Sequence, residues 1–224
     1  MSTFLALCAL AGTQGQVPDS DRFIATFSVD KKDFVTTGKN PYFILEPEFQ
    51  IVLKGATEEV VITVLEKTKM VDGIKTRVVE EREFEDGELK EVSLNYFAMD
   101  RKTKAVYYFG EDVDIYEDGK VVRHEGAWLS GEKGARFGMI MPGEPRVGFR
   151  HYQEIAPGSA LDRAEVVSLS ELIKTPGGEF KNCLKIEETS GLDAKEKGFK
   201  TFAPGIGMVQ DEDMLLVRYG MIDD

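Results

Sequence analysis

The sequence predicts an all-β fold, an antiparallel meander that closes into a barrel-like or sandwich sheet with little helix. Three Asp-Gly pairs carry this prediction, because Asp72-Gly73, Asp86-Gly87 and Asp118-Gly119 each lie between runs rich in Val, Ile, Tyr and Phe. Such a pair is typical of a two-residue type I′ hairpin turn, in which both central residues need positive φ. The second observation is that no segment has a comparable helical pattern.

The strand candidates follow one another along the chain with few interruptions. They span residues 23–29, 49–54, 59–69, 74–84, 89–99, 105–109, 113–116, 120–128, 146–155, 164–173, 179–187, 199–202 and 214–219. This number of strands is enough to close a barrel or to form a sandwich. Because no linker, low-complexity tract or fixed-period repeat separates them, we expect a single β domain over residues 17–224.

The turns also predict strand registers. With a two-residue loop at Asp86-Gly87, Glu83 faces Lys90 and Arg82 faces Glu91, so that opposite charges pair across the hairpin. This arrangement predicts a solvated, charge-paired end for these two strands.

The hairpin at Asp118-Gly119 is treated in the same way. A two-residue loop pairs Glu117 with Lys120, Asp114 with Arg123 and Val113 with His124. His124 then lies on the apolar face of its strand.

Composition excludes several classes of partner. The chain has 28 Lys and Arg against 40 Asp and Glu, a net charge of -12, which repels phosphate backbones and anionic lipid surfaces. Nucleic acid is therefore not an expected partner. No apolar run approaches the length of a membrane span.

Residues 1–16 resemble an export signal. They contain a short apolar stretch in which Ala9 and Ala11 stand like the small residues before a signal-peptidase site. No Lys or Arg precedes the stretch, which indicates a truncated start; a first strand or a frayed end is the alternative. Export predicts a periplasmic or secreted protein. Because Cys8 lies in this segment, the mature chain would keep Cys183 and have no internal disulfide.

Cys183 is not expected to react. Strand alternation places it on the face of Lys181 and Lys185, whose ammonium groups would lower its pKa somewhat. No histidine lies near it in sequence to act as a base, so an inert thiol is favoured over a nucleophile.

Asp112 and Asp114 are weak candidates for a metal site. They belong to an acidic run of the kind that hard cations prefer, but the spacing does not match an EF-hand loop. A solvated strand face, in which Arg123 pairs with Asp114, explains the run better. We therefore predict no metal site.

The two histidines suggest a ligand pocket. Alternation places His124 on the same face as Trp128, and His151 on the same face as Gln153, both directed inward. Two imidazoles, an indole and an amide inside an apolar barrel would form a small polar site. With Glu154 on the opposite face, His151 could also work as an acid or base. Alternatively, each histidine is a core residue that hydrogen-bonds to backbone.

Residues 130–148 are rich in glycine and proline around a short apolar stretch. One interpretation is a loop that folds Met139 and Met141 over the mouth of a barrel, where thioethers suit adaptable apolar contacts. The other is a short edge strand between ordinary turns.

Several motifs together resemble a family of uncharacterised bacterial secreted proteins. They are TKMVDG at 68–73, YYFGED at 107–112, EGAW at 125–128, MPG at 141–143, QEIAPG at 153–158 and APGIGMV at 203–209. The resemblance extends from about residue 40 to residue 209 and implies export and a β-rich single domain, but no activity. The family pattern has tyrosine-arginine where this chain has His151-Tyr152, which argues against a histidine mechanism, whereas Trp128, Gln153 and Glu154 match the pattern.

These observations favour an exported, acidic, non-catalytic protein that binds a small or apolar ligand, or a cation, inside a barrel-like sheet. The candidate ligand-binding residues are His124, Trp128, Met139, Met141, His151, Gln153 and Glu154. One alternative is an enzyme of hydrolase or isomerase type that uses His151 and Glu154. Another is a structural or assembly module that pairs through exposed sheet edges. The sequence assigns no cofactor and no oligomeric state.

Overall fold

The computed structural model describes residues 22–193, 195 and 197–222. In this part of the chain the fold is all-β, as predicted, and the helical structure is one short 3-10 helix, η2 (Lys31–Asp33). None of the described helical structure is long and apolar enough to cross a membrane. The predicted signal segment 1–16 and Cys8 lie outside the described residues, so export stays a prediction.

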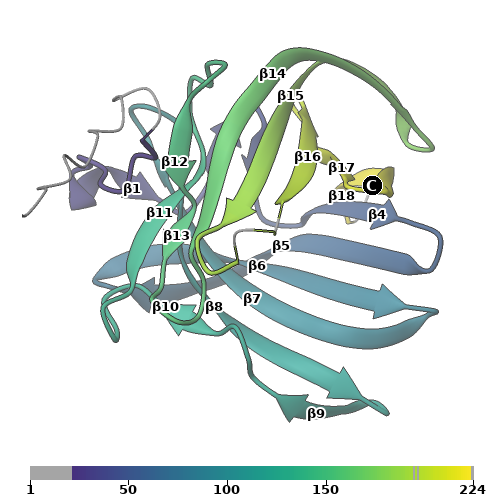
Figure 1. The fold of residues 1–224 in the computed structure, drawn as a ribbon, viewed down its shortest axis with the longest axis horizontal. Helices are drawn as coiled ribbons and strands as arrows, with labels where there is room; N and C mark the ends of the chain where they lie inside the picture. The colour runs from purple at the N-terminus through teal and green to yellow at the C-terminus, as the bar shows by residue number, and fades with distance from the viewer. Residues whose placement is uncertain (1–21, 194, 196, 223–224) are drawn as a thin grey trace, which may run out of the picture.

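Sixteen strands form one sheet, and two more, β2 and β3, form a separate antiparallel pair (Figure 1). In chain order the strands are β1 (Phe34–Val35), β2 (Gly38–Asn40), β3 (Phe43–Leu45), β4 (Phe49–Lys54), β5 (Glu58–Val71), β6 (Ile74–Glu85), β7 (Glu88–Asp100), β8 (Val106–Glu117), β9 (Lys120–Arg123), β10 (Trp128–Leu129), β11 (Arg136–Met141), β12 (Arg150–Tyr152), β13 (Glu154–Ile155), β14 (Asp162–Thr175), β15 (Gly178–Ser190), β16 (Lys197–Ala203), β17 (Gly207–Asp211) and β18 (Met214–Met221).

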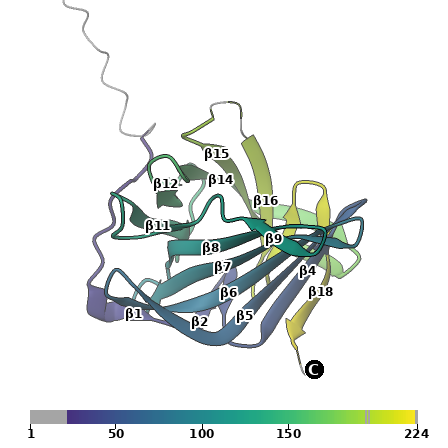
Figure 2. The same cartoon turned by 90° about the horizontal axis from the view of Figure 1, so that it is seen from below.

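The large sheet is an antiparallel meander nearly closed into a barrel. Its main path starts at β12, continues through β14 to β18 and β4 to β8, and ends with β11 and β13. The two ends of the path, β12 and β13, are neighbours in the chain and are separated only by Gln153. The segment formed by β12, Gln153 and β13 therefore joins the two ends of the path, because β12 pairs with β14 and β13 pairs with β11. Figure 1 looks into the barrel, and Figure 2 shows β4 to β8 side by side.

The three Asp-Gly turns form as predicted. The aspartates Asp72, Asp86 and Asp118 have φ of 48°, 51° and 50°, and the glycines after them have φ of 73°, 79° and 72°. Residues on either side of each turn pair directly, as in Val71 with Ile74, so each loop has two residues. Positive φ at both central positions is the geometry of a type I′ turn.

The register predicted beyond the second turn is wrong. A β-bulge lies between Glu83 and Phe84, so Glu83 pairs with Glu91 and Arg82 pairs with Val92. A bulge places two residues of one strand opposite one residue of its partner. Side chains beyond the bulge therefore point to the face opposite to the one that regular alternation predicts. The result is a like-charged Glu83–Glu91 pair, where a regular hairpin would have placed Lys90 opposite Glu83.

The third hairpin shows the same effect. Glu117 pairs with Lys120 as predicted, but a bulge then pairs Arg123 with Ile115. The prediction that His124 faces inward is wrong: it follows the end of β9, and its side chain is 69% exposed. Its Nδ1 lies 2.9 Å from the carbonyl oxygen of Val113 and 2.8 Å from Oδ1 of Asp114.

The segment 23–29 is not the strand we predicted. Ile24 forms an isolated parallel bridge with His151, and the rest of the segment runs without a ladder. Its apolar residues cover the outer face of the sheet, where Phe27 contacts Tyr107 with ring centroids 5.5 Å apart. Apolar side chains can be buried by packing on the face of a sheet, so an apolar pattern in the sequence does not require that the segment pair as a strand.

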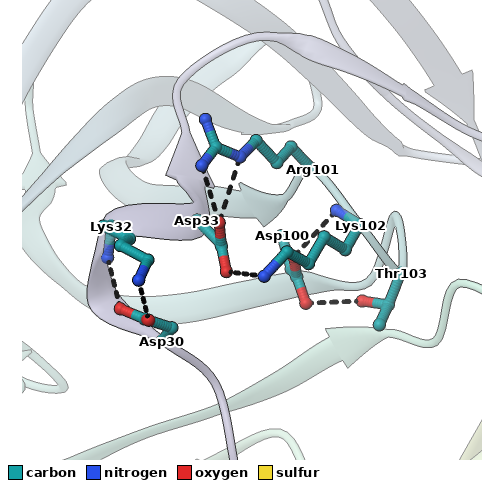
Figure 3. Close-up of polar contacts among 7 residues, drawn as sticks. All are labelled: Asp30, Lys32, Asp33, Asp100, Arg101, Lys102 and Thr103. Atoms are coloured by element: carbon teal, nitrogen blue, oxygen red, sulfur yellow. Dashed lines mark hydrogen bonds and ion pairs between the residues drawn. The ribbon is translucent and has the colours of Figure 1, made fainter.

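A charged clamp fastens this N-terminal segment to the β7–β8 turn (Figure 3). The buried Asp33 accepts hydrogen bonds from Arg101, at 2.7 Å from Nη2 and 3.1 Å from Nε, and from the Lys102 ammonium. Asp100 shapes the same turn by accepting hydrogen bonds at 2.9 Å from the Lys102 backbone N–H and the Thr103 hydroxyl. The hydrogen bonds from Lys102 and Arg101 hold the pKa of Asp33 below its usual value.

The glycine- and proline-rich region contains β11, which pairs with both β8 and β13. Met141 belongs to the core inside the barrel, and Met139 to the core under the N-terminal segment. The prediction of a loop that carries these methionines over the barrel mouth is therefore wrong.

Cys183 is fully buried in β15. Asn182 has a φ of 55° and the register shifts beside Cys183, so strict alternation with Lys181 and Lys185 is broken. Burial raises the pKa of the thiol, in contrast to the lowered pKa that we predicted. This supports an inert thiol.

Candidate functional site: the barrel interior

The barrel interior contains a partly open cavity of about 260 Å³. Its apolar lining consists of Phe43, Ile62, Val79, Phe97, Ile140, Ala160, Phe202 and Met208. Its polar lining consists of Glu81, Asn95, Tyr108, Glu111, Gln153, Glu154, Asp162, Glu188 and Lys200. An apolar cavity with a limited set of polar groups is typical of small-molecule sites.

Strand register explains why apolar and acidic side chains meet here. Ile62 on β5 is paired with Glu81 on β6, while one step along the same face Val64 is paired with Val79. Val79 is paired in turn with Asn95 on β7. Because residues two apart share a face, Val79 and Glu81 both face the cavity. The inner wall therefore changes from apolar to acidic within one strand.

The positive charge of Lys200 is already matched within the cavity wall. Its Nζ lies 3.0 Å from Oε2 of Glu188 and 3.7 Å from Oδ2 of Asp211. Gln153 donates a hydrogen bond of 2.7 Å from Nε2 to Oε1 of Glu188 and so supports the pair. The charge of Glu188 is the main reason that the pKa of Lys200 is raised above its usual value. This lysine is therefore held as a cation by two carboxylates.

Three other carboxyl groups of the cavity are not matched in this way. Burial raises the pKa of Glu81 to about 8 and that of Glu111 to about 7. Burial also raises the pKa of Glu154 well above its usual value, although its Oε1 accepts a hydrogen bond of 2.7 Å from the Asp162 backbone N–H. Within the described residues, the ion pairs of the cavity involve none of these three groups.

Glu81 is desolvated enough for burial to raise its pKa, yet its side chain keeps partial solvent exposure. The two observations agree because Glu81 faces the cavity rather than packed side chains. Its carboxyl group is therefore both desolvated and accessible from inside the barrel.

Aromatic rings line the route from the apolar wall to Glu111. Phe43 contacts Phe97 at 5.2 Å between ring centroids, Phe97 stacks on Tyr108 at 4.8 Å, and Tyr108 meets Trp128 edge-on at 5.2 Å. The hydroxyl of Tyr108 donates a hydrogen bond of 2.6 Å to Oδ1 of Asn95. The series of rings ends beside the Glu111 carboxyl.

Trp128 and Tyr108 both act on Glu111. Contacts from the Tyr108 hydroxyl and the Trp128 indole lower the pKa of Glu111, against the larger effect of burial that raises it. The indole N–H is buried and has no hydrogen bond of good geometry in the described part of the chain. The free indole N–H favours the anionic form of Glu111 over the neutral acid, whereas the hydroxyl proton of Tyr108 is already donated to Asn95.

Two further cavities adjoin the central one. A cavity of about 200 Å³ shares Glu111 and is lined by Trp128 and Pro157. An apolar cavity of about 80 Å³ shares Ile62, Phe202 and other residues of the apolar wall. The central cavity thus adjoins an apolar cavity through Ile62 and Phe202 and a charged one through Glu111, whose lining also includes Lys133.

The residues predicted from sequence are distributed unevenly. Gln153 and Glu154 line the central cavity, and Trp128 lines the adjoining one. His151 is buried, but the lining of the described cavities does not include it. His124, Met139 and Met141 lie elsewhere, as described above.

Gln153 and Glu154 both face the cavity because the chain kinks between β12 and β13. Regular alternation would have put them on opposite faces, as we predicted. The reason for the kink is that β12 pairs with β14, whereas β13 pairs with β11.

The sequence reasoning missed Glu81, Glu111 and Lys200. A signal for Glu81 was present, since it alternates with Val79 on what should be an apolar face. Glu111 had no such signal, because the register of β7 and β8 shifts between Asn95 and Phe97.

His151 lies in apolar surroundings beside Phe149, with ring centroids 5.3 Å apart. Burial lowers its pKa to about 4, which outweighs the opposing effect of the nearby backbone of Tyr152 and Met139. Neither ring nitrogen makes a hydrogen bond of good geometry within the described residues, and none joins His151 to Glu154. A neutral histidine without such a contact lacks the geometry of an acid–base pair.

The two weak metal candidates have protein partners. Asp112 accepts hydrogen bonds from Lys69, at 2.7 Å, and from the hydroxyl of Tyr96. Asp114 lies beside His124, not Arg123. The described residues contain no group of three or more His, Cys, Asp or Glu side chains arranged to hold a metal ion.

Comparison with family models, curated proteins and solved structures finds no match for this chain. The resemblance to uncharacterised bacterial secreted proteins therefore stays a prediction.

Proposed function

We propose that this protein is an exported, non-catalytic barrel-like protein that binds a small molecule in its interior. The observation that carries this proposal is the cavity of about 260 Å³, in which an apolar wall meets a limited number of buried polar groups. The barrel walls hold these groups in place, so a ligand would bind to a site that is already formed.

Two other functions have less support. An enzyme that uses His151 and Glu154 would need these groups within reach of one substrate, and His151 lies away from the cavity lining. An assembly module would need long unpaired sheet edges. Here the two ends of the main sheet path are joined through Gln153.

Fluorescence of the neutral apolar dye N-phenyl-1-naphthylamine tests the binding function. We expect saturable binding that Ile62→Trp abolishes, because the larger ring fills the cavity, while Val61→Trp on the opposite face of β5 leaves binding intact. Circular dichroism would verify that both variants fold. Absence of saturable binding, or equal binding by both variants, would contradict a ligand site inside the barrel.

Export is a separate part of the proposal and rests on the pattern in residues 1–16. Expression of the chain in a bacterium, followed by cell fractionation and N-terminal sequencing, tests it. We expect a periplasmic or secreted product that has lost this segment. A full-length product in the cytoplasm would contradict export.

A further inference from the structure

We infer that the ligand of the barrel interior is an organic ammonium with an apolar body, whose charged group binds among Glu81, Glu111 and Glu154. This inference rests on the proposed binding function and names the class of ligand. Four features of the cavity support it.

The first feature is the balance of charge inside the barrel. Lys200 is the cation in the cavity lining, and Glu188 and Asp211 already neutralise it. Glu81, Glu111 and Glu154 take part in none of the described ion pairs, although the charge of Lys200 acts on Glu81 and offsets part of the burial that raises its pKa. A buried carboxylate without a counter-charge is unfavourable, so a cationic ligand would supply what the site lacks.

The second feature is the aromatic lining that leads to these carboxyls. The rings of Phe97 and Tyr108 stack at 4.8 Å, and Trp128 stands edge-on to Tyr108 at 5.2 Å. Organic ammonium groups are attracted to the faces of aromatic rings, and Trp is the strongest of these partners. Such rings give a carboxylic acid ligand no comparable advantage.

The third feature is the free donor beside Glu111. The indole N–H of Trp128 is buried beside this carboxyl without a hydrogen bond of good geometry, whereas the hydroxyl proton of Tyr108 is already donated to Asn95. The indole donor is best used when Glu111 is an anion. An arriving ammonium would offset the burial of that anion, and the indole N–H would then have a full acceptor.

The fourth feature is the apolar end of the cavity. Ile62, Phe202 and Met208 line both the central cavity and the adjoining apolar cavity of about 80 Å³. This space has no group that could bind a second charge, so it suits an alkyl or aryl body. Small inorganic cations would leave it empty.

A matched series of six-carbon probes tests the inference. Hexylammonium, hexanol and hexanoate share one apolar body and differ in charge. We would titrate each into the full-length protein at pH 8.5, which lies above the pKa of about 8 for Glu81 and of about 7 for Glu111 and at which an alkylammonium remains protonated. The fluorescence of Trp128, the single tryptophan of the chain, reports binding, and calorimetry provides the affinity.

We expect hexylammonium to bind at least about tenfold more tightly than hexanol, and hexanoate to bind most weakly. Glu81→Gln and Glu111→Gln should each reduce the affinity for hexylammonium by about tenfold and leave that for hexanol unchanged. Glu85→Gln is the matched control, because it removes the same charge at the exposed end of the same strand. It should change neither affinity.

The wild-type series is decisive even if a variant fails to fold. Equal binding of hexylammonium and hexanol, or tighter binding of hexanoate, would overturn the ammonium inference and leave the binding function standing. If N-phenyl-1-naphthylamine binds but none of the three probes does, the ammonium inference is likewise rejected. If neither the dye nor any probe binds, the proposed binding function fails as well.

Discussion

Carboxyl groups occur in two contrasting settings in this molecule. In the clamp, Asp33 is buried and accepts hydrogen bonds from Arg101 and Lys102, which lower its pKa. In the barrel interior, Glu81 and Glu111 line the cavity and take part in none of the described ion pairs, and burial raises the pKa of each, to about 8 and about 7. The first setting stabilises the fold, whereas the second weakens it at neutral pH.

This difference separates structural carboxylates from candidates for function. An acid outside any ion pair in a barrel interior costs stability that an apolar residue would not, and groups with such perturbed pKa values cluster at functional sites. Raised pKa values in a cavity therefore point to a ligand, whereas a lowered pKa in a complete ion pair points to stability.

The largest expected effect comes from Lys200→Met. Removing this cation leaves Glu188 and Asp211 without their partner, so we expect the free energy of unfolding at pH 7 to fall by about 2–3 kcal/mol. Urea denaturation measures the change. Lys197→Met, which affects an exposed pair with Glu187, is the control and should change it by less than about 0.5 kcal/mol. Equal effects of the two variants would show that the interior pair has no special role.

The second expected effect is a pH dependence of the free energy of unfolding, to which the interior glutamates and Asp33 contribute with opposite signs. Because the folded-state pKa values of Glu81 and Glu111 lie above 4.5, the folded protein binds extra protons. The stability that these two glutamates contribute is therefore fully present below about pH 4.5 and is lost as the pH rises toward 8. The Glu81→Gln/Glu111→Gln double variant should reduce this slope, leaving the part contributed by Glu154, and gain about 1–2 kcal/mol at pH 8.

Urea denaturation from pH 4 to pH 9 measures this slope for the wild type and the double variant. The Glu85→Gln variant is the control and should keep the wild-type slope, since Glu85 is exposed. A double variant with an unchanged slope would show that the interior carboxyls titrate normally.

The third effect is a loss of stability on Asp33→Asn. A neutral amide cannot replace the carboxylate between Lys102 and Arg101, so we expect Tm at pH 7 to fall by about a few degrees. Because the pKa of Asp33 is lowered, its contribution is present above about 3.8 and is lost as the pH falls through the folded value. The deficit should thus disappear near pH 2. A deficit that persists there would rule out the charged clamp as its cause.

The smallest expected effect is that of Asp114→Asn. Asp114 lies on the exposed hairpin beside His124, so the free energy of unfolding should change by less than about 0.5 kcal/mol. Chemical denaturation at pH 7 measures it. A loss comparable to that of Asp33→Asn would show that exposure does not separate the two ion pairs.

The sequence was sufficient for the fold class and the three hairpin loops, because the Asp-Gly signal is local. It was not sufficient for the faces beyond each turn. The bulges at Glu83 and Ile115 reverse the alternation, and bulges have no simple sequence signature. That is why His124 was placed inside and Glu91 was placed opposite Arg82.

The prediction of the candidate site was incomplete for the same reason. Gln153 and Glu154 were identified, but Glu111 and Lys200 reach the cavity through long-range register, which periodicity cannot supply. The segment 23–29 was misassigned because its apolar residues cover a sheet face instead of joining the ladder.

Titration of the carboxyl carbons by NMR tests the central contrast most directly. Spectra of the ligand-free protein, assigned with Glu81→Gln, Glu111→Gln and Asp33→Asn, would give the three pKa values. We predict about 8 for Glu81, about 7 for Glu111 and a value below 3.8 for Asp33. Ordinary values between about 4 and 5 for both glutamates would contradict the account, because the barrel interior would then be no different from the protein surface.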